Sequence, residues 1–241
     1  MKAVILCGGL GTRLRPITYE IPKVLIPVQG KPVLEHLIDL LKREGVDDIV
    51  LSVGHLRDRI RAHCGNGSRL GVRISYLEEA SPLGTGGPLR LLDPPREPFI
   101  VSNGDELKDI DLREMLALHQ QTNALATIAL TQVENPTVYG VARLEGQLIR
   151  EFVEKPLHPP SNLANAGLYI LDPAVIDLVP NGFAMLEKDV FPQIARQGRL
   201  AGYPFTGQWF DTGSFERYER AIREWRGLSA LDAQKPAHFS T

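Results

Sequence analysis

The 241-residue sequence has only two cysteines, Cys7 and Cys64, which excludes a fold held together by a disulfide framework. It has no apolar run close to the roughly 18 residues of a membrane helix, and its start lacks the apolar segment and cleavage site of a signal peptide. Lysine and arginine (27) nearly balance aspartate and glutamate (29), which indicates no surface for nucleic acid or acidic lipid. We therefore expect a cytoplasmic protein that binds neither membranes nor nucleic acids.

Several catalytic and cofactor motifs are also missing. The sequence contains neither the G-x-x-x-x-G-K-[ST] of a P-loop nor the G-x-G-x-x-G of a dinucleotide site, and no acidic residue for a nicotinamide ribose follows its first glycines. No Ser-His-Asp or Cys-His set is evident among its six histidines and two cysteines. These absences disfavour nicotinamide chemistry and covalent catalysis.

The stretch from residue 3 to residue 27 is the most informative part of the chain. The apolar run Ala3 to Leu6 predicts a buried parallel strand, and a glycine-rich loop follows it directly. Glycine allows a tight turn whose N–H groups approach a ligand, and clustered cations neutralise phosphate charge. The loop and the residues after it contribute Gly8, Gly9, Gly11, Arg13, Arg15 and Lys23. Together they predict a polyphosphate site, whereas the glycines alone would equally fit an ordinary turn.

The order of predicted elements indicates the fold class. Strand and helix patterns alternate through the first half, which is typical of an α/β protein with a mostly parallel mixed sheet flanked by helices. The second half is richer in strands. We expect strands at 3–6, 48–53, 72–77, 98–102, 127–131, 140–144 and 148–153, and helices at 33–41, 57–64 and 86–92. This size fits a single catalytic domain over residues 1–226, followed by a loosely ordered tail at 227–241.

Two aspartates are the candidate metal ligands. Asp105 and Asp211 each follow a short apolar strand, in FIVSNGD and GQWFD. Magnesium typically takes one or two protein carboxylates and completes its shell with water and phosphate oxygens, so this sparse pair is sufficient. Asp109 and Asp111 lie close by, but we expect both of them to cap a helix.

The C-terminal segment shows helical spacing of its large apolar residues. Phe215, Tyr218, Ile222 and Trp225 recur at this spacing, and Ser214 is in the position of an N-cap. We expect a helix whose apolar residues are core contacts.

The string GGLGTRLRPIT followed by PKVLIPV resembles the signature of the sugar-nucleotide pyrophosphorylases, nucleotidyltransferases that join a sugar 1-phosphate to a nucleoside triphosphate. The resemblance continues in family order through LGTGG (83–87), NGD (103–105), VEKP (153–156), NAGLYI (165–170) and WFDTG (209–213), and it covers about residues 1–225. It implies a nucleotidyltransferase fold with a sugar-binding second half, and Mg²⁺ as cofactor.

The resemblance also implies a role for each matching residue. Arg13, Lys23, Asp105 and Asp211 would be catalytic, with Arg13 on the β and γ phosphates, Lys23 near the reacting centre and both aspartates on one metal ion. The nucleotide would contact Leu6, Gly8, Gly9, Gly11, Thr12, Arg13, Lys23, Gly84 and Gly87. The sugar phosphate would contact Asn103, Gly140, Glu154, Lys155 and Asn165, with Lys155 on its phosphate.

The substrate is less firmly indicated than the reaction. PLGTGGPL, YGV and FVEKP resemble mannose-1-phosphate and heptose-1-phosphate guanylyltransferases more than glucose-1-phosphate thymidylyltransferases. We expect GTP with a manno-configured sugar. Uridylyltransferases for glucose or N-acetylmuramic acid 1-phosphate remain the main alternative, followed by thymidylyl or cytidylyl transfer to glucose 1-phosphate. A catalytically silent regulatory subunit is a further alternative. We expect a monomer or homodimer that binds small molecules.

Overall fold

The structure, a computed structural model, describes residues 1–229. Two compact units are distinguished in this part of the chain, unit 1 with residues 1–82, 102–110 and 207–229, and unit 2 with residues 83–101 and 111–206. Most of the predicted tail lies outside the described residues. The single catalytic domain stays a prediction. No helix of the described residues has the length and apolar character needed to cross a bilayer.

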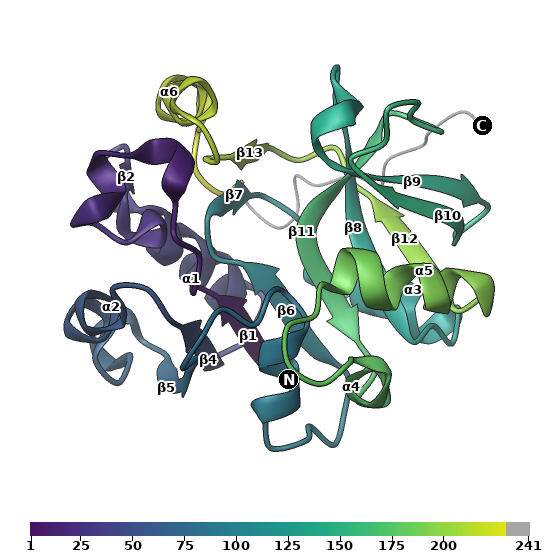
Figure 1. Ribbon diagram of the computed structural model, residues 1–241, viewed down its shortest axis with the longest axis horizontal. Coiled ribbons are helices and arrows are strands. Elements are labelled where there is room, and N and C mark those ends of the chain that lie inside the picture. Colours follow the sequence, from purple (N-terminus) through teal and green to yellow (C-terminus); the bar gives the residue numbers. More distant parts are fainter. Residues whose placement is uncertain (230–241) are drawn as a thin grey trace. The chain divides into compact units, whose positions relative to one another are not determined.

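Unit 1 contains a parallel sheet in the order β5-β4-β1 (Figure 1). The strands are β1 (Lys2–Leu6), β4 (Asp48–Val53) and β5 (Arg73–Glu78). In β1, Ala3, Val4 and Ile5 are fully buried, as the unbroken apolar run predicts. A further strand, β6 (Phe99–Asn103), has residues in both units. The parallel strands of the first half are therefore confirmed.

The helices of unit 1 follow the sequence pattern closely. They are α1 (Val33–Arg43), α2 (Arg57–Cys64) and α6 (Phe215–Glu224), with 3-10 turns at Thr12–Leu14, Ile17–Tyr19, Lys23–Leu25 and Ser68–Leu70. Gly45 follows α1 with φ +76°, a left-handed conformation that glycine adopts without a Cβ penalty. Ser214 caps α6 by accepting a hydrogen bond from the backbone N–H of Arg217.

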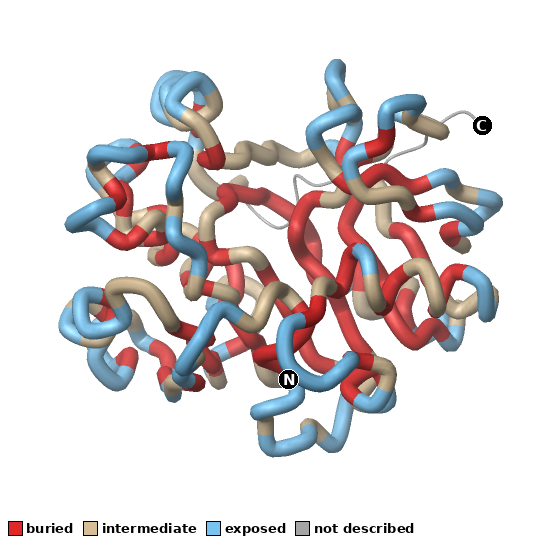
Figure 2. The backbone as a smooth tube through the Cα atoms, viewed as in Figure 1, coloured by how far each residue is buried: buried red, intermediate tan, exposed pale blue. Residues whose placement is uncertain are grey.

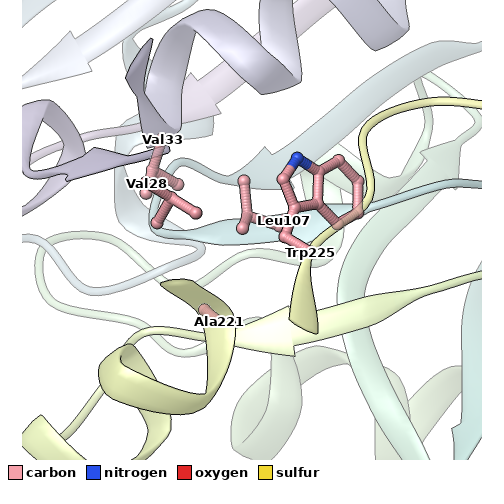
Figure 3. Close-up of a cluster of buried hydrophobic side chains, with 5 residues drawn as sticks. All are labelled: Val28, Val33, Leu107, Ala221 and Trp225. Carbon is pink, nitrogen blue, oxygen red and sulfur yellow. The ribbon is translucent and has the colours of Figure 1, made fainter. Parts of the chain in front are cut away.

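Two short antiparallel pairs complete unit 1. β2 (Pro27–Val28) pairs with β3 (Lys31–Pro32), and β7 (Glu106–Lys108) pairs with β13 (Trp209–Asp211). Val28, Val33, Leu107, Ala221 and Trp225 form one buried cluster (Figure 3). The cluster attaches the end of α6 to both strand pairs and to the start of α1.

The face that α6 buries differs from the predicted one. Trp225 is 1% exposed and Tyr218 packs partly against the cluster, but Phe215 and Ile222 are 47% and 40% exposed. Most of α6 is coloured as exposed in Figure 2. The expectation that all four residues are core contacts was therefore wrong for Phe215 and Ile222.

Unit 2 contains a mixed sheet in the order β11-β8-β12-β10-β9, with a further pairing between β11 and β9. Its strands are β8 (Ala126–Gln132), β9 (Gly140–Glu145), β10 (Leu148–Glu154), β11 (Leu163–Leu171) and β12 (Leu200–Pro204). Only β8 and β12 run parallel; the other pairs are antiparallel. The mixed α/β class is confirmed. These five strands all come from the second half of the chain, and the role of that half in sugar binding stays a prediction.

The helices of unit 2 are at most ten residues long. They are α3 (Leu112–Gln121), α4 (Val175–Leu178), α5 (Phe191–Arg196), the π-helix η7 (Leu186–Val190) and the 3-10 helices η5 (Gly87–Leu91) and η6 (Pro136–Val138). The helix predicted at 86–92 is the 3-10 helix η5. Asp111 caps α3 as predicted, by accepting from the N–H groups of Arg113 and Glu114.

Asp109 does not cap a helix, contrary to expectation. Its carboxylate accepts hydrogen bonds from the Arg43 guanidinium at 2.6 Å and from the hydroxyl of Ser229 at 2.5 Å. Arg43 also donates to the carbonyl of Ile110 at 2.7 Å. A buried carboxylate requires such partners because desolvation penalises its charge. Asp109 therefore joins α1 to the segment after α6.

The contact between His36 and Trp225 predicts a pH effect on stability. His36 Nε2 lies 3.1 Å from the carbonyl of Val28, and Trp225 Nε1 donates to His36 Nδ1 at 3.3 Å, so the ring is neutral with its proton on Nε2. Burial lowers the pKa of His36. As the pH falls, the unfolded chain therefore binds a proton at His36 before the folded protein does. The contribution of His36 to the free energy of unfolding is complete above about pH 6.5 and is lost as the pH falls below that value.

Denaturant unfolding at pH 7.5, 6.5 and 5.5 measures this effect. We expect His36→Gln to start less stable but to lose less unfolding free energy than the wild type between pH 7.5 and 5.5. Equal losses in the two proteins would contradict the assignment.

Candidate active site

The glycine loop after β1 is fixed by the packing of unit 1. A Cβ at Gly8 would lie 2.6 Å from Oε1 of Glu79, and a Cβ at Gly11 would lie 2.8 Å from Cγ2 of Thr18. Gly11 also has φ +60° and its carbonyl accepts from the Thr18 hydroxyl at 2.7 Å. A Cβ at Gly9 would meet nothing within 4 Å. The left-handed backbone and the contact with Thr18 therefore require glycine at position 11, whereas a side chain at Gly8 would displace the Glu79 carboxylate and Gly9 faces open space.

The NGD segment lies against the carboxyl end of β1. The backbone N–H of Gly104 donates to the carbonyl of Leu6 at 3.0 Å, and Leu6 is half-buried. A Cβ at Gly104 would lie 2.9 Å from that carbonyl oxygen and 3.1 Å from Sγ of Cys7. Burial raises the pKa of the Cys7 thiol, so Cys7 is a packed, unreactive neighbour. Only glycine permits this approach, which places Asp105 beside the glycine loop.

Asp105 forms an ion pair with Lys23, from the 3-10 turn after the loop. The side chains are 29% and 10% exposed, respectively. Burial acts to raise the pKa of Asp105, but the Lys23 ammonium outweighs it and holds that pKa below its usual range. The carbonyl of Asp105 accepts from the Thr212 hydroxyl at 2.8 Å, which ties it to the WFDTG segment.

Asp211 lies near the NGD segment because its strand, β13, pairs with β7, which begins directly after that segment. In this register Asp211 is opposite Glu106, the residue after Asp105. Its carboxylate accepts from Arg217 and from the N–H of Gly213. A Cβ at Gly213 would lie 2.6 Å from Oδ1 of Asp211 and 3.0 Å from Nη2 of Arg13. The four residues expected to be catalytic thus gather in unit 1, and Thr12 and Arg13 are exposed on its surface.

A buried charged pair beneath these aspartates was missed by the sequence analysis. Lys108 has no exposed side-chain surface and lies 3.3 Å from Glu106, which also accepts from Asn103 and Trp209 at 2.9 Å each. Burial raises the pKa of Glu106 and lowers that of Lys108. The opposite charges of Glu106 and Lys108, two residues apart and so on one face of a strand, were the available signal. Asn103, expected on the sugar, here holds Glu106 in unit 1.

The other predicted nucleotide residues lie in unit 2. Gly84 has φ +77° and a Cβ there would lie 2.3 Å from the carbonyl oxygen of Ala184. A Cβ at Gly87 would lie 2.4 Å from the carbonyl oxygen of Gly182. The packing of unit 2 therefore explains both glycines without a ligand.

Three of the predicted sugar residues meet at the edge of the unit 2 sheet. Gly140 is directly opposite Glu154 in the pairing of β9 with β10, and a Cβ at Gly140 would lie 2.7 Å from Oε2 of Glu154. Lys155 Nζ lies 3.3 Å from Oε1 of Glu154, with its side chain 62% exposed. Lys155 has φ +50°, a left-handed conformation that is rare outside glycine. Backbone strain of this kind is found more often at functional sites than elsewhere.

Asn165 belongs to a hydrogen-bonded group on β11. Its Nδ2 donates to the hydroxyl of Tyr169 at 2.9 Å, and that hydroxyl donates to Oε1 of Glu187 at 3.0 Å. The second Glu187 oxygen accepts from Thr85 at 2.5 Å. Burial raises the pKa of Glu187, against the hydrogen bonds from Thr85 and Tyr169. Sequence analysis missed Glu187, which lies in a π-helix that no periodicity predicted.

Comparison with known proteins shows the family. The nucleotidyl transferase profile matches residues 2–226. The chain is 37% identical to a probable mannose-1-phosphate guanylyltransferase 2 of Arabidopsis thaliana, over 100% of this chain and 69% of that protein. It is 41% identical to the mannose-1-phosphate guanylyltransferase catalytic subunit beta of Xenopus tropicalis, over 88% of this chain and 61% of that protein. The chain thus matches only part of the length of these relatives.

Solved structures agree. A putative glucose-1-phosphate thymidylyltransferase from Bacillus anthracis has a TM-score of 0.85 at 30% identity, covering 92% of this chain and 94% of that one. HddC from Yersinia pseudotuberculosis, complexed with GMP-PN, has a TM-score of 0.78 at 28% identity, covering 92% and 98%. These matches confirm the resemblance carried by the glycine loop, NGD and WFDTG. The chain belongs to the nucleotidyl transferase family.

Proposed function

We propose that this protein transfers the GMP group of GTP to mannose 1-phosphate, giving GDP-mannose and pyrophosphate. The observation that carries the proposal is the Lys23–Asp105 pair beside the glycine loop, in a chain 37–41% identical to proteins named mannose-1-phosphate guanylyltransferases. An oxygen of the sugar phosphate attacks the α-phosphorus of GTP in line, and pyrophosphate leaves. Nucleotidyl transfer needs little covalent help, so positioning and charge stabilisation supply most of the acceleration.

The charges of unit 1 suit the triphosphate end of this reaction. Arg13 is exposed next to Gly213, and Lys23 is held at the loop by Asp105. We assign Arg13 to the β and γ phosphates and Lys23 to the phosphates nearest the reacting centre. The N–H groups of the glycine loop complete the anion site, with Gly9 open to the ligand.

Asp105 and Asp211 fit a magnesium ion as its two protein ligands. Asp211 pairs with Glu106, the residue after Asp105, and Thr212 donates to the carbonyl of Asp105, so the two aspartates belong to one region of unit 1. The described residues contain no group of three or more His, Cys, Asp or Glu that could hold a metal. Two carboxylates suffice because magnesium retains water and phosphate oxygens. A bound magnesium ion would neutralise charge on the phosphates. Lys23 and Arg217 would hold the two carboxylates in place through their ion pairs.

The residues of unit 2 suit a sugar phosphate. The exposed ammonium of Lys155 offers three donors to the phosphate, and Glu154 and Asn165 offer an acceptor and a donor to hydroxyl groups. Gly140 keeps the space beside Glu154 clear. We also propose a cytoplasmic monomer or homodimer, a location supported by the two free, buried cysteines.

The metal assignment predicts the effect of two substitutions. Asp105→Asn and Asp211→Asn each remove a ligand charge with little change of shape, so we expect turnover to fall about a hundredfold or more. Pyrophosphate release at saturating magnesium measures this. Asp39→Asn, which alters an ion pair with Lys31 at the surface of unit 1, is the control and should retain full turnover. Turnover within threefold of wild type in both variants would exclude these aspartates as ligands.

Two further substitutions separate the phosphate sites. Lys155→Ala should weaken binding of mannose 1-phosphate and leave GTP binding nearly intact, whereas Arg13→Ala should do the reverse, because each removes a cation that contacts the phosphates of one substrate only. Calorimetric titration with GTP alone distinguishes them, with Arg150→Ala, at an exposed ion pair of unit 2, as control. An equal loss of GTP affinity in both variants would show that Lys155 is misassigned.

The choice of base is tested by a substrate panel. GTP should exceed UTP and dTTP in kcat/KM by at least about tenfold, since a pyrimidine leaves groups of a guanine pocket unpaired at about 1 to 3 kcal/mol each. Pyrophosphate release with mannose, heptose and glucose 1-phosphates is the measurement. A pyrimidine triphosphate that outperforms GTP with every sugar phosphate would refute guanylyl transfer without touching the metal assignment.

A further inference from the structure

Glu187 is a buried carboxylate that none of the roles assigned above uses. The residue is 6% exposed and lies in the π-helix η7, yet both of its oxygens accept hydrogen bonds from residues far away in the sequence. Oε1 accepts from Tyr169 on β11 and Oε2 accepts from Thr85 in the 83–87 loop. One carboxylate thus contacts two segments that carry candidate substrate residues in unit 2.

A bulge in β11 brings Asn165 and Tyr169 together. The pairing of β11 with β8 shifts register between these two residues, so four steps along β11 correspond to two along β8. Gly167, inside the bulge, has φ +58° and donates its N–H to Oδ1 of Asn165 at 2.8 Å. In a regular strand, residues four apart are separated by about 13 Å, too far for direct contact of these side chains. Bulges often redirect side chains next to active sites.

The hydrogen bonds from Asn165 to Tyr169 and from Tyr169 to Glu187 run in one direction, toward the Glu187 carboxylate. Both Glu187 oxygens accept, so the Tyr169 hydroxyl donates its one proton to Glu187 and accepts from Nδ2 of Asn165. Oδ1 of Asn165 then faces the N–H of Gly167. The amide orientation is thereby fixed, and its second N–H is available to a sugar hydroxyl.

The other oxygen of Glu187 acts on the loop. Thr85 donates its hydroxyl proton to Glu187, and its oxygen accepts from the backbone N–H of Leu186 at 2.9 Å. Thr85 follows Gly84, which has φ +77°. The backbone of Gly84 is therefore in a left-handed conformation that residues with a side chain rarely adopt.

From this geometry we infer that Glu187 is a positioning residue with two arms, one that orients the Asn165 amide through Tyr169 and one that holds the 83–87 loop through Thr85. This inference rests on the proposed roles of Asn165 in sugar binding and of the loop in nucleotide binding. Glu187 itself touches no substrate. Its loss therefore weakens substrate binding more than it slows the chemical step.

Three variants separate the arms. Tyr169→Phe should raise the KM for mannose 1-phosphate about tenfold and leave the KM for GTP unchanged. Thr85→Val should raise the KM for GTP and leave that for mannose 1-phosphate unchanged. Glu187→Gln should raise both KM values, because an amide has only one oxygen and cannot accept from the Tyr169 and Thr85 hydroxyls on two separate atoms. In all three, kcat should stay within threefold of wild type.

Glu114→Gln is the matched control. Glu114, on α3, accepts from the hydroxyl of Tyr203, on β12, at 2.7 Å, which is the same chemistry in the same unit. Its KM values should be unchanged. Unchanged KM values in Tyr169→Phe and Thr85→Val, a fall in kcat alone, or equal effects in Glu114→Gln would overturn the inference. If Glu187→Gln does not fold, the two single-arm variants decide.

A measurement without turnover distinguishes this inference from the proposed function. The side-chain amide signals of Asn165 in a ¹⁵N correlation spectrum are identified by their absence in Asn165→Asp. They should shift in Tyr169→Phe and Glu187→Gln but not in Glu114→Gln. A wild type that is inactive with GTP and mannose 1-phosphate would refute the function alone, whereas unmoved Asn165 signals would refute the positioning role whatever the activity.

Discussion

The hydrogen bond from Gly104 to the carbonyl of Leu6 is the contact on which the candidate active site of unit 1 depends. It joins the end of the first strand to the NGD segment, about a hundred residues later, and it exists only because residue 104 has no side chain. Asp105 then meets Lys23, and Thr212 adds the WFDTG segment by donating to the carbonyl of Asp105. Three motifs that are distant in sequence thus share one turn.

Much of unit 1 could be predicted because its signals are local. Ala3 to Leu6 is an unbroken apolar run, α2 has the predicted bounds, and Ser214 and Asp111 cap helices through residues two or three positions away. The candidate residues Arg13, Lys23, Asp105 and Asp211 were named from motifs, and the fold gathers them in one unit. Their catalytic roles remain the proposal made above.

The features that could not be predicted depend on contacts that no local sequence pattern indicates. Asp109 precedes a helix, as a cap would, but its partner Arg43 is 66 residues away and a buried ion pair outweighs a cap. The spacing of Phe215 and Ile222 indicates a helix without telling which face meets the core. Glu187 is a buried carboxylate whose hydrogen-bond donors, Thr85 and Tyr169, lie 102 and 18 residues away in the sequence. Such pairs determine the site as much as the motifs do.

Pyrophosphate release by Gly104→Ala, compared with Gly202→Ala, tests the central claim most directly. A Cβ at Gly104 would press on the Leu6 carbonyl, whereas a Cβ at Gly202 would press on Leu144 and Leu130 in the core of unit 2. At a temperature where both variants are folded, Gly104→Ala should lose at least about a hundredfold in kcat/KM, the scale of displacing a catalytic group. Gly202→Ala should stay within threefold of wild type. Equal activity in the two variants would contradict the view that this one backbone contact assembles the active site.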